Sequence, residues 1–239
     1  VDTAYSEEQM KVGRKLANKL LNVTKFVLQF GAPAGDRSLD AAITDPIDRS
    51  MLAKLDEVIT DATAAFEAFD YARALERTEA FFWWFCDNYV ELVKGRTYDE
   101  ARPDAADSAK RALRTALSTV QRLFAPILPF AAEEAWSWWN ESSVHTASWP
   151  TLLATGEPFG DAALVDVPIE VLTRVRRAKT EAKRSQRAVV ESLVVTAPAG
   201  AQSALEAGRA DLVDAGSIRS LSVVEGDTLD VVVTLAPDD

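Results

Sequence analysis

The sequence predicts a mainly helical protein, a helical bundle followed by a small α+β subdomain. Apolar residues recur at spacings of three and four over most of the first 140 residues, which is typical of amphipathic helices. Proline and glycine clusters divide these runs into helices of ordinary length. After residue 185 the pattern changes to β-branched runs separated by turn signals. We therefore predict a helical domain at 1–150, a linker at 151–166 and an α+β subdomain at 167–239.

The composition supports a folded protein and narrows its possible partners. The 239 residues are 48% hydrophobic, which is enough for a sizeable core. The net charge of −11 disfavours indiscriminate coating of nucleic acid or of an anionic membrane, so a polyanion site must be local. No apolar run approaches the roughly 18 residues of a membrane span, and no targeting segment is visible. We expect a cytoplasmic protein with no membrane partner.

Cysteine and histidine each occur once, and this limits the chemistry. Cys86 alone can form neither an internal disulfide nor a multi-cysteine metal site, and we expect it to be a buried apolar group. His145 alone excludes most catalytic triads and His-ligated zinc sites. We predict no metal site, no cofactor and no catalytic residue in this chain.

The first two helices follow from periodicity and capping signals. Apolar residues from Glu7 to Phe30 form one stripe, so a helix is predicted there. A breaker cluster, Gly31–Asp36, ends it. Asp45 offers an N-cap followed by proline at the first helical position, and a second helix should run from here to about Ala68.

Three further helices complete the predicted bundle. A third, Ala72–Lys94, is apolar on every side at Phe81–Cys86, which favours a central core position over a base-stacking platform. A fourth is predicted at Asp107–Phe124. Two prolines then break the chain before a fifth at Phe130–Asn140. The following segment, Ser143–Pro150, is predicted to be extended.

The tail contains two helical and three strand-like segments. A helix is predicted from Val167 to about Ser185, and another at Ala201–Ala215. The strands are predicted at Val189–Thr196, Ile218–Val224 and Thr228–Leu235, because these runs are rich in β-branched residues.

The first of two basic islands lies on the first helix, Lys11–Lys25, where five cations occur without an acid. Three lysines and two asparagines step by 4, 3, 4 and 3 and should share one face, opposite the apolar stripe. Cations suit phosphates and amides suit base edges, so this face is a candidate RNA surface. A plain solvated helix face is the alternative. The five residues are Lys11, Lys15, Asn18, Asn22 and Lys25.

The second island, Arg174–Arg187, carries seven cations and one acid. Cations at this density repel one another unless a polyanion or an acidic neighbour compensates. Residues 191–239 are strongly acidic and could be that neighbour. Intramolecular balance therefore remains an alternative to RNA binding for this island.

Four segments, in order over about residues 7–150, resemble a known family. Arg14–Leu28 resembles the opening helix of the anticodon-binding bundle of class Ia aminoacyl-tRNA synthetases, and Phe85-Cys86-Asp87-Asn88-Tyr89 looks like the form found in valyl-tRNA synthetases. Leu123–Trp136, with its two prolines and Glu-Glu-Ala-Trp ending, is similar to the family's next motif. Ser143–Pro150 resembles the one that follows. An isoleucyl or leucyl synthetase, or a helical interaction scaffold without RNA binding, remains an alternative.

The resemblance implies an anticodon-binding region that recognises valine tRNA. It also implies that the protein is a monomer. The His-Ile-Gly-His and Lys-Met-Ser-Lys-Ser signatures are absent, so ATP and Mg²⁺ would belong to a catalytic domain of the same polypeptide outside this sequence, and this chain alone should be inactive. Many valyl enzymes end in a coiled coil, but no heptad run follows residue 190. The expected tRNA-binding residues are Arg14, Lys15, Asn18, Lys19, Asn22 and Lys25, the stacking candidates Phe26, Phe30 and Arg37, and Arg176, Arg177, Lys183 and Arg184 of the second island.

Overall fold

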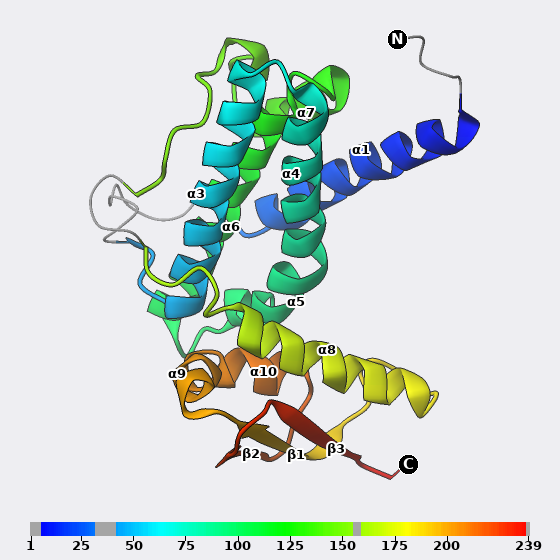
Figure 1. Cartoon of the computed structure of the whole chain (residues 1–239), viewed down its shortest axis with the longest axis vertical. Helices are drawn as coiled ribbons and strands as arrows, with labels where there is room; N and C mark the ends of the chain where they lie inside the picture. The colour runs from blue at the N-terminus through cyan, green and yellow to red at the C-terminus, as the bar shows by residue number, and fades with distance from the viewer. Residues whose placement is uncertain (1–5, 32–41, 155–158, 238–239) are drawn as a thin grey trace. The chain divides into compact units, whose positions relative to one another are not determined.

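The computed structural model describes residues 6–31, 42–154 and 159–237, and it confirms a mainly helical chain with a small sheet near the C-terminus (Figure 1). The chain forms two compact units. Unit 1 comprises Val1–Gly35, Leu55–Phe82 and Leu113–Leu153, and unit 2 comprises Asp36–Lys54, Trp83–Ala112 and Ala154–Asp239. The division predicted at residues 150 and 166 remains a prediction.

Helix α1 (Glu7–Leu28) begins where the sequence predicted and ends two residues earlier. The Ser6 hydroxyl caps it by accepting a hydrogen bond from the Gln9 N–H at 3.3 Å. The apolar stripe is buried from Leu16 onward, with Leu20 and Val27 fully enclosed, whereas Val12 near the start of the helix is 43% exposed. Helix α1 packs against α7 (Pro129–Ser137) within unit 1.

The second predicted helix is α3 (Pro46–Glu67), and a carboxylate oxygen of Asp45 accepts from the Ile47 N–H at 2.9 Å, as a cap should. The predicted third helix is more complex. A π-helical turn, η1 (Phe85–Tyr89), separates α4 (Tyr71–Trp84) from α5 (Val90–Val93). Such a turn inserts one residue into the helical repeat, and the four residues of α5 are too few for apolar periodicity to reveal the shift.

The aromatic centre of this third helical run belongs to the core, as predicted. Phe82 and Phe85 are fully buried, and Phe81 and Cys86 are nearly so. Phe82 meets Phe124 edge to face, with ring centroids 5.3 Å apart. A base-stacking role for these rings is thereby excluded, because a stacking platform needs exposed faces.

After the 3₁₀ turn η2 (Arg96–Tyr98), α6 (Pro103–Phe124) starts four residues before the predicted position, because proline is well accommodated in the first helical turn. The segment Ser143–Pro150 contains a correction. Instead of being extended throughout, it includes the 3₁₀ turn η3 (Val144–Thr146). Glu133 fixes this turn by accepting hydrogen bonds from the Ser143 hydroxyl and the Val144 N–H, both at 2.9 Å.

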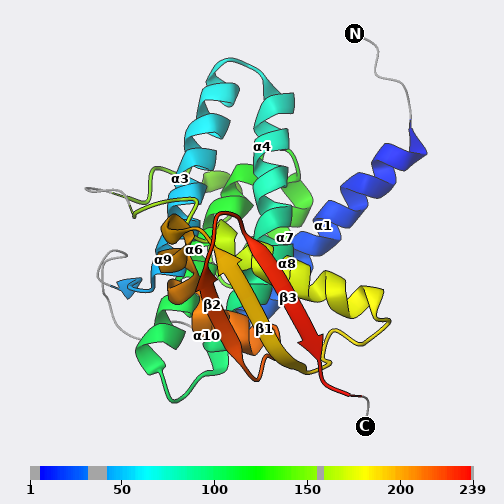
Figure 2. The ribbon, with the colours of Figure 1, turned by 60° about the horizontal axis from the view of Figure 1, so that its bottom comes forward.

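The tail forms a three-stranded mixed sheet with the strand order β2-β1-β3 (Figure 2). Central strand β1 (Val190–Ala197) runs parallel to β2 (Leu221–Glu225) and antiparallel to β3 (Asp230–Leu235). Leu193 lies opposite both Leu221 and Val233 in this register.

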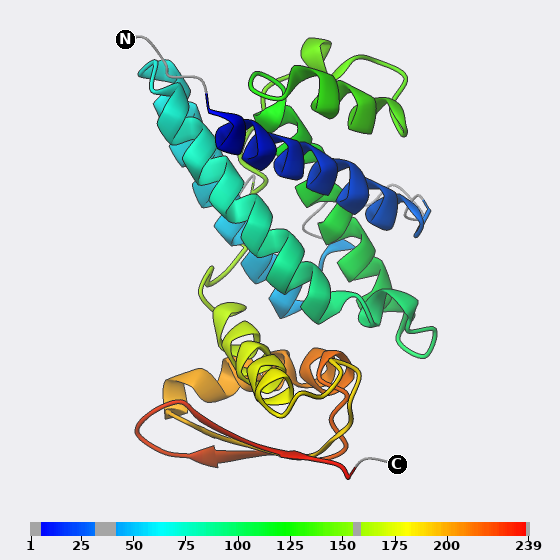
Figure 3. The ribbon, with the colours of Figure 1, turned by 90° about the vertical axis from the view of Figure 1, so that its right-hand side faces the viewer.

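Three helices, α8 (Asp166–Glu181), α9 (Ala199–Ala207) and α10 (Arg209–Ala215), cover one face of this sheet (Figure 3). The single helix predicted at Ala201–Ala215 is wrong, because the chain breaks at Gly208. A Cβ at Gly208 would lie 2.7 Å from the Cβ of Pro168, so glycine allows α8 to approach closely at the break.

The opposite face of the sheet is more exposed. Val224 and Val232 retain 49% and 56% of their accessible surface, whereas Leu193 and Val195 on the helix-covered face of β1 are fully buried. This contrast follows the alternation of side chains along a strand. The hydrophobic core of the tail therefore lies between the sheet and its three helices.

Unit 2 contains a buried ionic cluster around Arg96, whose side chain is 1% exposed. Its guanidinium pairs with Asp45 at 2.8 Å, Asp48 at 2.8 Å and Asp211 of α10 at 3.0 Å. The Tyr89 and Ser108 hydroxyls each donate to Asp48 at 2.7 Å. One cation thus faces three carboxyl groups inside the protein.

This excess of acids perturbs the pKa values of the cluster. Burial raises the pKa of Asp211 to about 7, although Arg96 opposes the shift. Burial and neighbouring Asp48 also raise the pKa of Asp45. Burial disfavours the charge of Arg96, but the aspartates outweigh that effect and raise its pKa. The cluster therefore tends to retain a proton near neutral pH.

Candidate nucleic-acid interface

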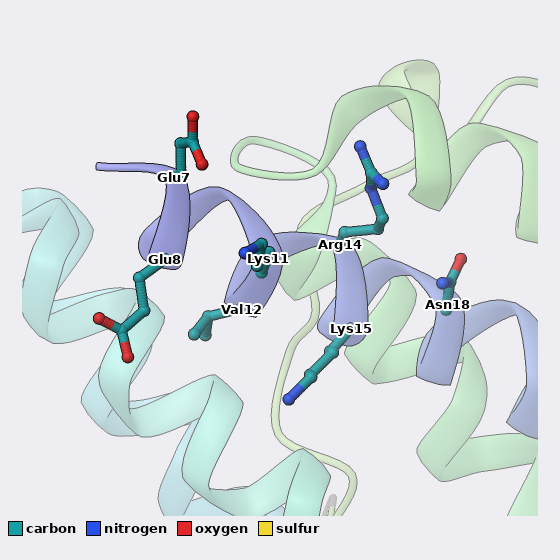
Figure 4. Close-up of a pocket in the computed structure, with 7 residues that line it drawn as sticks. All are labelled: Glu7, Glu8, Lys11, Val12, Arg14, Lys15 and Asn18. Atoms are coloured by element: carbon teal, nitrogen blue, oxygen red, sulfur yellow. The ribbon is translucent and has the colours of Figure 1, made fainter. Parts of the chain in front are cut away.

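The polar face predicted on α1 is present and exposed. Helical periodicity turns the apolar stripe inward and leaves the opposite side of the helix to solvent. A cavity of about 640 Å³ lies at the N-terminal half of α1, and its lining side chains point to both sides of the helix (Figure 4). Its lining residues are Glu7, Glu8, Lys11, Val12, Arg14, Lys15 and Asn18.

The cations and amides of this surface do not form a single row. Figure 4 shows Arg14 and Lys15 pointing to different sides of α1, with Asn18 one turn further along. Asn22 and Lys25 continue the exposed face toward the C-terminal end of the helix. The helix thus presents charged and amide groups over more than one side of its surface.

Lys19 and the two phenylalanines lie in a more enclosed environment. Lys19 is half-buried and has contacts within the protein. Phe26 and Phe30 are also half-buried and meet edge to face, with centroids 5.1 Å apart. Arg37, the remaining predicted residue near this helix end, lies outside the described residues.

An indole ring accompanies the C-terminal half of α1. The Lys25 ammonium lies 5.4 Å from the centroid of the Trp138 ring, which is within cation–π range. The Trp138 indole N–H donates to a carboxylate oxygen of Glu134 at 3.0 Å, and this bond fixes the ring orientation. Trp138 is partly exposed, so the exposed face of α1 ends beside an aromatic surface.

A chain of polar contacts holds α1 to α6 and to the segment after α7. Gln121 donates to the Thr24 hydroxyl at 3.1 Å and accepts from the Trp139 indole N–H at 3.1 Å. Arg114 lies 5.0 Å from the Trp139 ring centroid and donates to the Gly31 carbonyl at 2.8 Å. These bonds fix the position of the end of α1, where the stacking candidates lie.

Sequence reasoning missed Trp138 and Arg114 as members of this surface. Arg114 is 83 residues from its partner Gly31, and helical periodicity carries no information about such distant pairs. The signal that could identify Trp138 is the density of tryptophans at 136–139, since three such rings exceed what one short helix needs for packing.

The second island lies in unit 2, and much of its charge is compensated within the protein. Arg176 donates to the Asp87 carbonyl at 3.3 Å and pairs with Glu91 at 3.4 Å, and Arg177 pairs with Glu181 at 2.7 Å. Arg184 donates to the Ala236 carbonyl at 3.1 Å. Internal compensation is thus present, but the pairing acids are Glu91 and Glu181 rather than the acids of residues 191–239 that the sequence led us to expect. RNA binding by these residues stays a prediction.

Lys183 differs from the other cations of the island. It is exposed, and its backbone adopts a left-handed conformation with φ of 55° at the C-terminal end of α8. No side-chain partner of Lys183 occurs among residues 6–31, 42–154 and 159–237. Its ammonium group is therefore available to an external anion.

Two kinds of feature are absent from the part of the chain that the structure describes. No group of three or more His, Cys, Asp or Glu side chains there is arranged to hold a metal ion. None of the described helices combines the length and apolar character needed to cross a membrane.

Comparison with known proteins gives a consistent result. Residues 48–194 match the family model described as the anticodon-binding domain of tRNA ligase. The chain is 54% identical to valine--tRNA ligase from Leifsonia xyli subsp. xyli, over all of this chain and 28% of that protein. It is 50% identical to the same enzyme from Thermobifida fusca, over 99% of this chain and 27% of that protein.

More distant similarity covers the same region. Valine--tRNA ligase from Tropheryma whipplei strain Twist is 40% identical over 95% of this chain and 27% of the relative. The chain thus spans a little over a quarter of the length of these curated relatives.

Proposed function

The chain belongs to the family of anticodon-binding domains of tRNA ligases, and on that basis we propose that it binds the anticodon stem-loop of valine tRNA. The similarity to valine--tRNA ligases, at 40–54% identity, favours valine over isoleucine or leucine tRNA. In this proposal the chain positions the tRNA, and the chemistry takes place elsewhere in the ligase.

The exposed face of α1 carries the proposal. Its cations can contact phosphates, and these contacts supply affinity without sequence information. Its asparagine amides both donate and accept hydrogen bonds, which suits the edges of unstacked loop bases. The residues proposed to contact tRNA are Arg14, Lys15, Asn18, Lys19, Asn22, Lys25, Phe26, Phe30 and Arg37, with Arg176, Arg177, Lys183 and Arg184 as further backbone contacts.

Trp138 adds a stacking surface to this proposal. Single-stranded bases stack on aromatic rings, and each stacked base is worth about 1–3 kcal/mol. The ring is partly exposed and is held in place by its hydrogen bond to Glu134. A loop base that displaced the Lys25 ammonium from the ring would free this cation for a neighbouring phosphate.

The catalytic part of the function is proposed from the relatives, because this chain covers only 27–28% of their length. The ligase would join valine to its tRNA with ATP and Mg²⁺, and these would bind in the polypeptide outside this chain. The chain itself would need no cofactor and would be inactive alone. We further propose that the ligase is cytoplasmic and monomeric.

The test uses the full-length ligase and measures kcat/KM for valine attachment to native valine tRNA and to copies with single changes in the anticodon. The changes Asn18→Ala and Asn22→Ala should lower kcat/KM for native tRNA by about 5- to 150-fold, which corresponds to about 1–3 kcal/mol. They should lower it less for a tRNA whose anticodon base is already wrong. Equal losses for all tRNAs would refute base reading by α1.

A charge reversal separates backbone contacts from base contacts. Lys15→Glu should weaken binding of all tRNA copies alike and reduce the salt dependence of affinity by about one charge. Arg73→Glu changes an exposed cation on α4 that is not among the proposed tRNA contacts, and it serves as the matched control. Similar effects of both reversals would indicate general electrostatics and contradict a local interface.

A further inference from the structure

A second cavity lies at the turn between α3 and α4 in unit 1, and none of the proposed tRNA contacts lines it. It has a volume of about 550 Å³, enough for one or two side chains. Its walls come from the end of α3, the start of α4, the segment after α6 and the segment after η3. The lining residues are Thr63, Phe66, Glu67, Tyr71, Pro126 and Trp149.

Three aromatic rings form the walls and are held in fixed positions. Phe66 meets Trp149 edge to face, with ring centroids 5.1 Å apart. The Tyr71 ring is tilted against Phe66, with centroids 5.7 Å apart. The Trp149 indole N–H donates to the Thr63 hydroxyl at 2.8 Å, which locks its orientation. A preformed aromatic site of this kind loses little conformational entropy on binding.

The adjoining turn displays a fourth ring at a conformational penalty. Phe69 adopts φ of 58°, a left-handed conformation that is uncommon for bulky residues and that favours glycine at a helix end. Its side chain is 78% exposed and lies edge to face with Tyr71, itself 54% exposed. Folding alone favours a small or polar residue here, so this exposed pair points to a binding role.

The charge around the cavity selects the kind of ligand. Glu67 lines it and is exposed, and its carboxylate has no ion-pair partner among the described residues. Asp70 lies in the same turn, where its carboxylate accepts a hydrogen bond from the Arg73 N–H at 3.1 Å. Carboxylates repel phosphates, while aromatic faces and carboxylates both attract organic cations.

We propose that this cavity binds an arginine side chain from the ligase polypeptide outside this chain. A guanidinium group is planar, stacks on aromatic rings and pairs with a carboxylate, and this matches the walls and the rim of the cavity better than the compact ammonium of lysine. The proposal rests on the proposed function, in which the chain is part of a longer ligase.

The strength of such a contact favours an intramolecular partner. A cation–π contact changes an equilibrium constant by about 2- to 30-fold, which is too little to recruit a free protein. The same contact suffices to hold an arginine of the same polypeptide in the cavity, because the effective concentration of that side chain is in the millimolar range, on the order of that for short linkers. The relatives supply that polypeptide, since this chain covers 27–28% of their length.

The experiment places a photocrosslinker in the full-length ligase. Phe69 is replaced by p-benzoylphenylalanine, the purified enzyme is irradiated without tRNA, and the crosslinked peptides are identified by mass spectrometry. We expect a peptide from outside these 239 residues that contains an arginine. Glu67→Lys and Tyr71→Ala should each lower its yield at least 5-fold, and so should replacement of that arginine by methionine.

Glu57→Lys is the matched control, because it reverses an exposed acid on the same helix away from the cavity and should leave the yield unchanged. A crosslink to a peptide without arginine, no intramolecular crosslink, or a yield insensitive to Glu67→Lys would each overturn the proposal. So would a crosslink to tRNA in a parallel irradiation with tRNA added. The anticodon dependence of kcat/KM, measured on the same enzyme, keeps a failure here distinct from a failure of the proposed function.

Discussion

The buried cluster around Arg96 predicts that the substitution Asp211→Asn stabilises the chain at alkaline pH and has little effect in acid. Asparagine has nearly the shape of aspartate and keeps an oxygen that can accept from the Arg96 Nε–H, at 3.0 Å in the structure. The change therefore removes a titrating charge with little loss of packing.

The magnitude follows from the pKa of Asp211. A rise from 3.8 to about 7 corresponds to about 4 kcal/mol, at 1.36 kcal/mol for each unit. Because the folded-state pKa is raised, the stabilising effect of this carboxyl is fully present below pH 3.8 and is lost as the pH rises through about 7. Asp211→Asn removes that loss, so the advantage of the variant should grow with pH.

Urea unfolding of the 239-residue chain and its Asp211→Asn variant, at pH 5, 6, 7 and 8, measures this difference. We expect the difference in unfolding free energy to shift toward the variant by a few kcal/mol between pH 5 and 8. Since Asp45 pairs with the same arginine and its charge contributes to the raised pKa of Asp211, these two carboxyl groups are coupled, and carbon NMR of both side chains should show linked transitions. A difference independent of pH would refute the reasoning.

Two further predictions concern packing. Gly95→Ala should lower the melting temperature, because the new Cβ would lie 1.4 Å from a carboxylate oxygen of Asp214, and adding Asp214→Ala should restore part of the loss. A loss that Asp214→Ala cannot relieve would contradict this close approach. Leu20→Ala should lower the unfolding free energy by about 2–5 kcal/mol, since Leu20 is fully buried, whereas Met10→Ala on the same helix is 59% exposed and should have little effect. Urea unfolding of both variants tests this pair, and equal losses would argue against the position of α1.

Helix α1 was predictable because its signals are local. A period near 3.6 places Leu20 in the core and Asn18 in solvent, and no other part of the chain needs to be known. Asp45 as a helix cap is a similar case, since the N–H it accepts from belongs to Ile47, two residues away. Patterns within one or two turns of a helix are readable in this way.

The Arg96 cluster was not predictable because its partners are distant. Asp211 lies 115 residues from Arg96, and Asp48 lies 48 residues away, so each appears in the sequence as an ordinary surface charge. The π-helical turn at Phe85–Tyr89 escaped for another reason: the helix that follows it, Val90–Val93, is only four residues long, which is too short to display a shifted periodicity.

The candidate site likewise contains residues that local sequence patterns predict and residues that depend on contacts distant in the sequence. The exposed residues of α1 were predicted as a set, while Trp138 beside Lys25 depends on how α7 packs against α1. In the second island, sequence alone left RNA binding and internal pairing open. Arg176 contacts the Asp87 carbonyl and the Glu91 carboxylate, and only the fold shows these two partners.

The strand order of the tail has a consequence for synthesis. Central strand β1 is made first, yet both of its partners, β2 and β3, are made later. On the ribosome, β1 therefore emerges with two open edges, and the second edge is covered only after Leu235 has been added. A product truncated after Glu225 would keep the β1 edge that normally pairs with β3 unpaired. Unpaired strand edges promote association between chains, so such a product should aggregate where the complete tail stays dispersed.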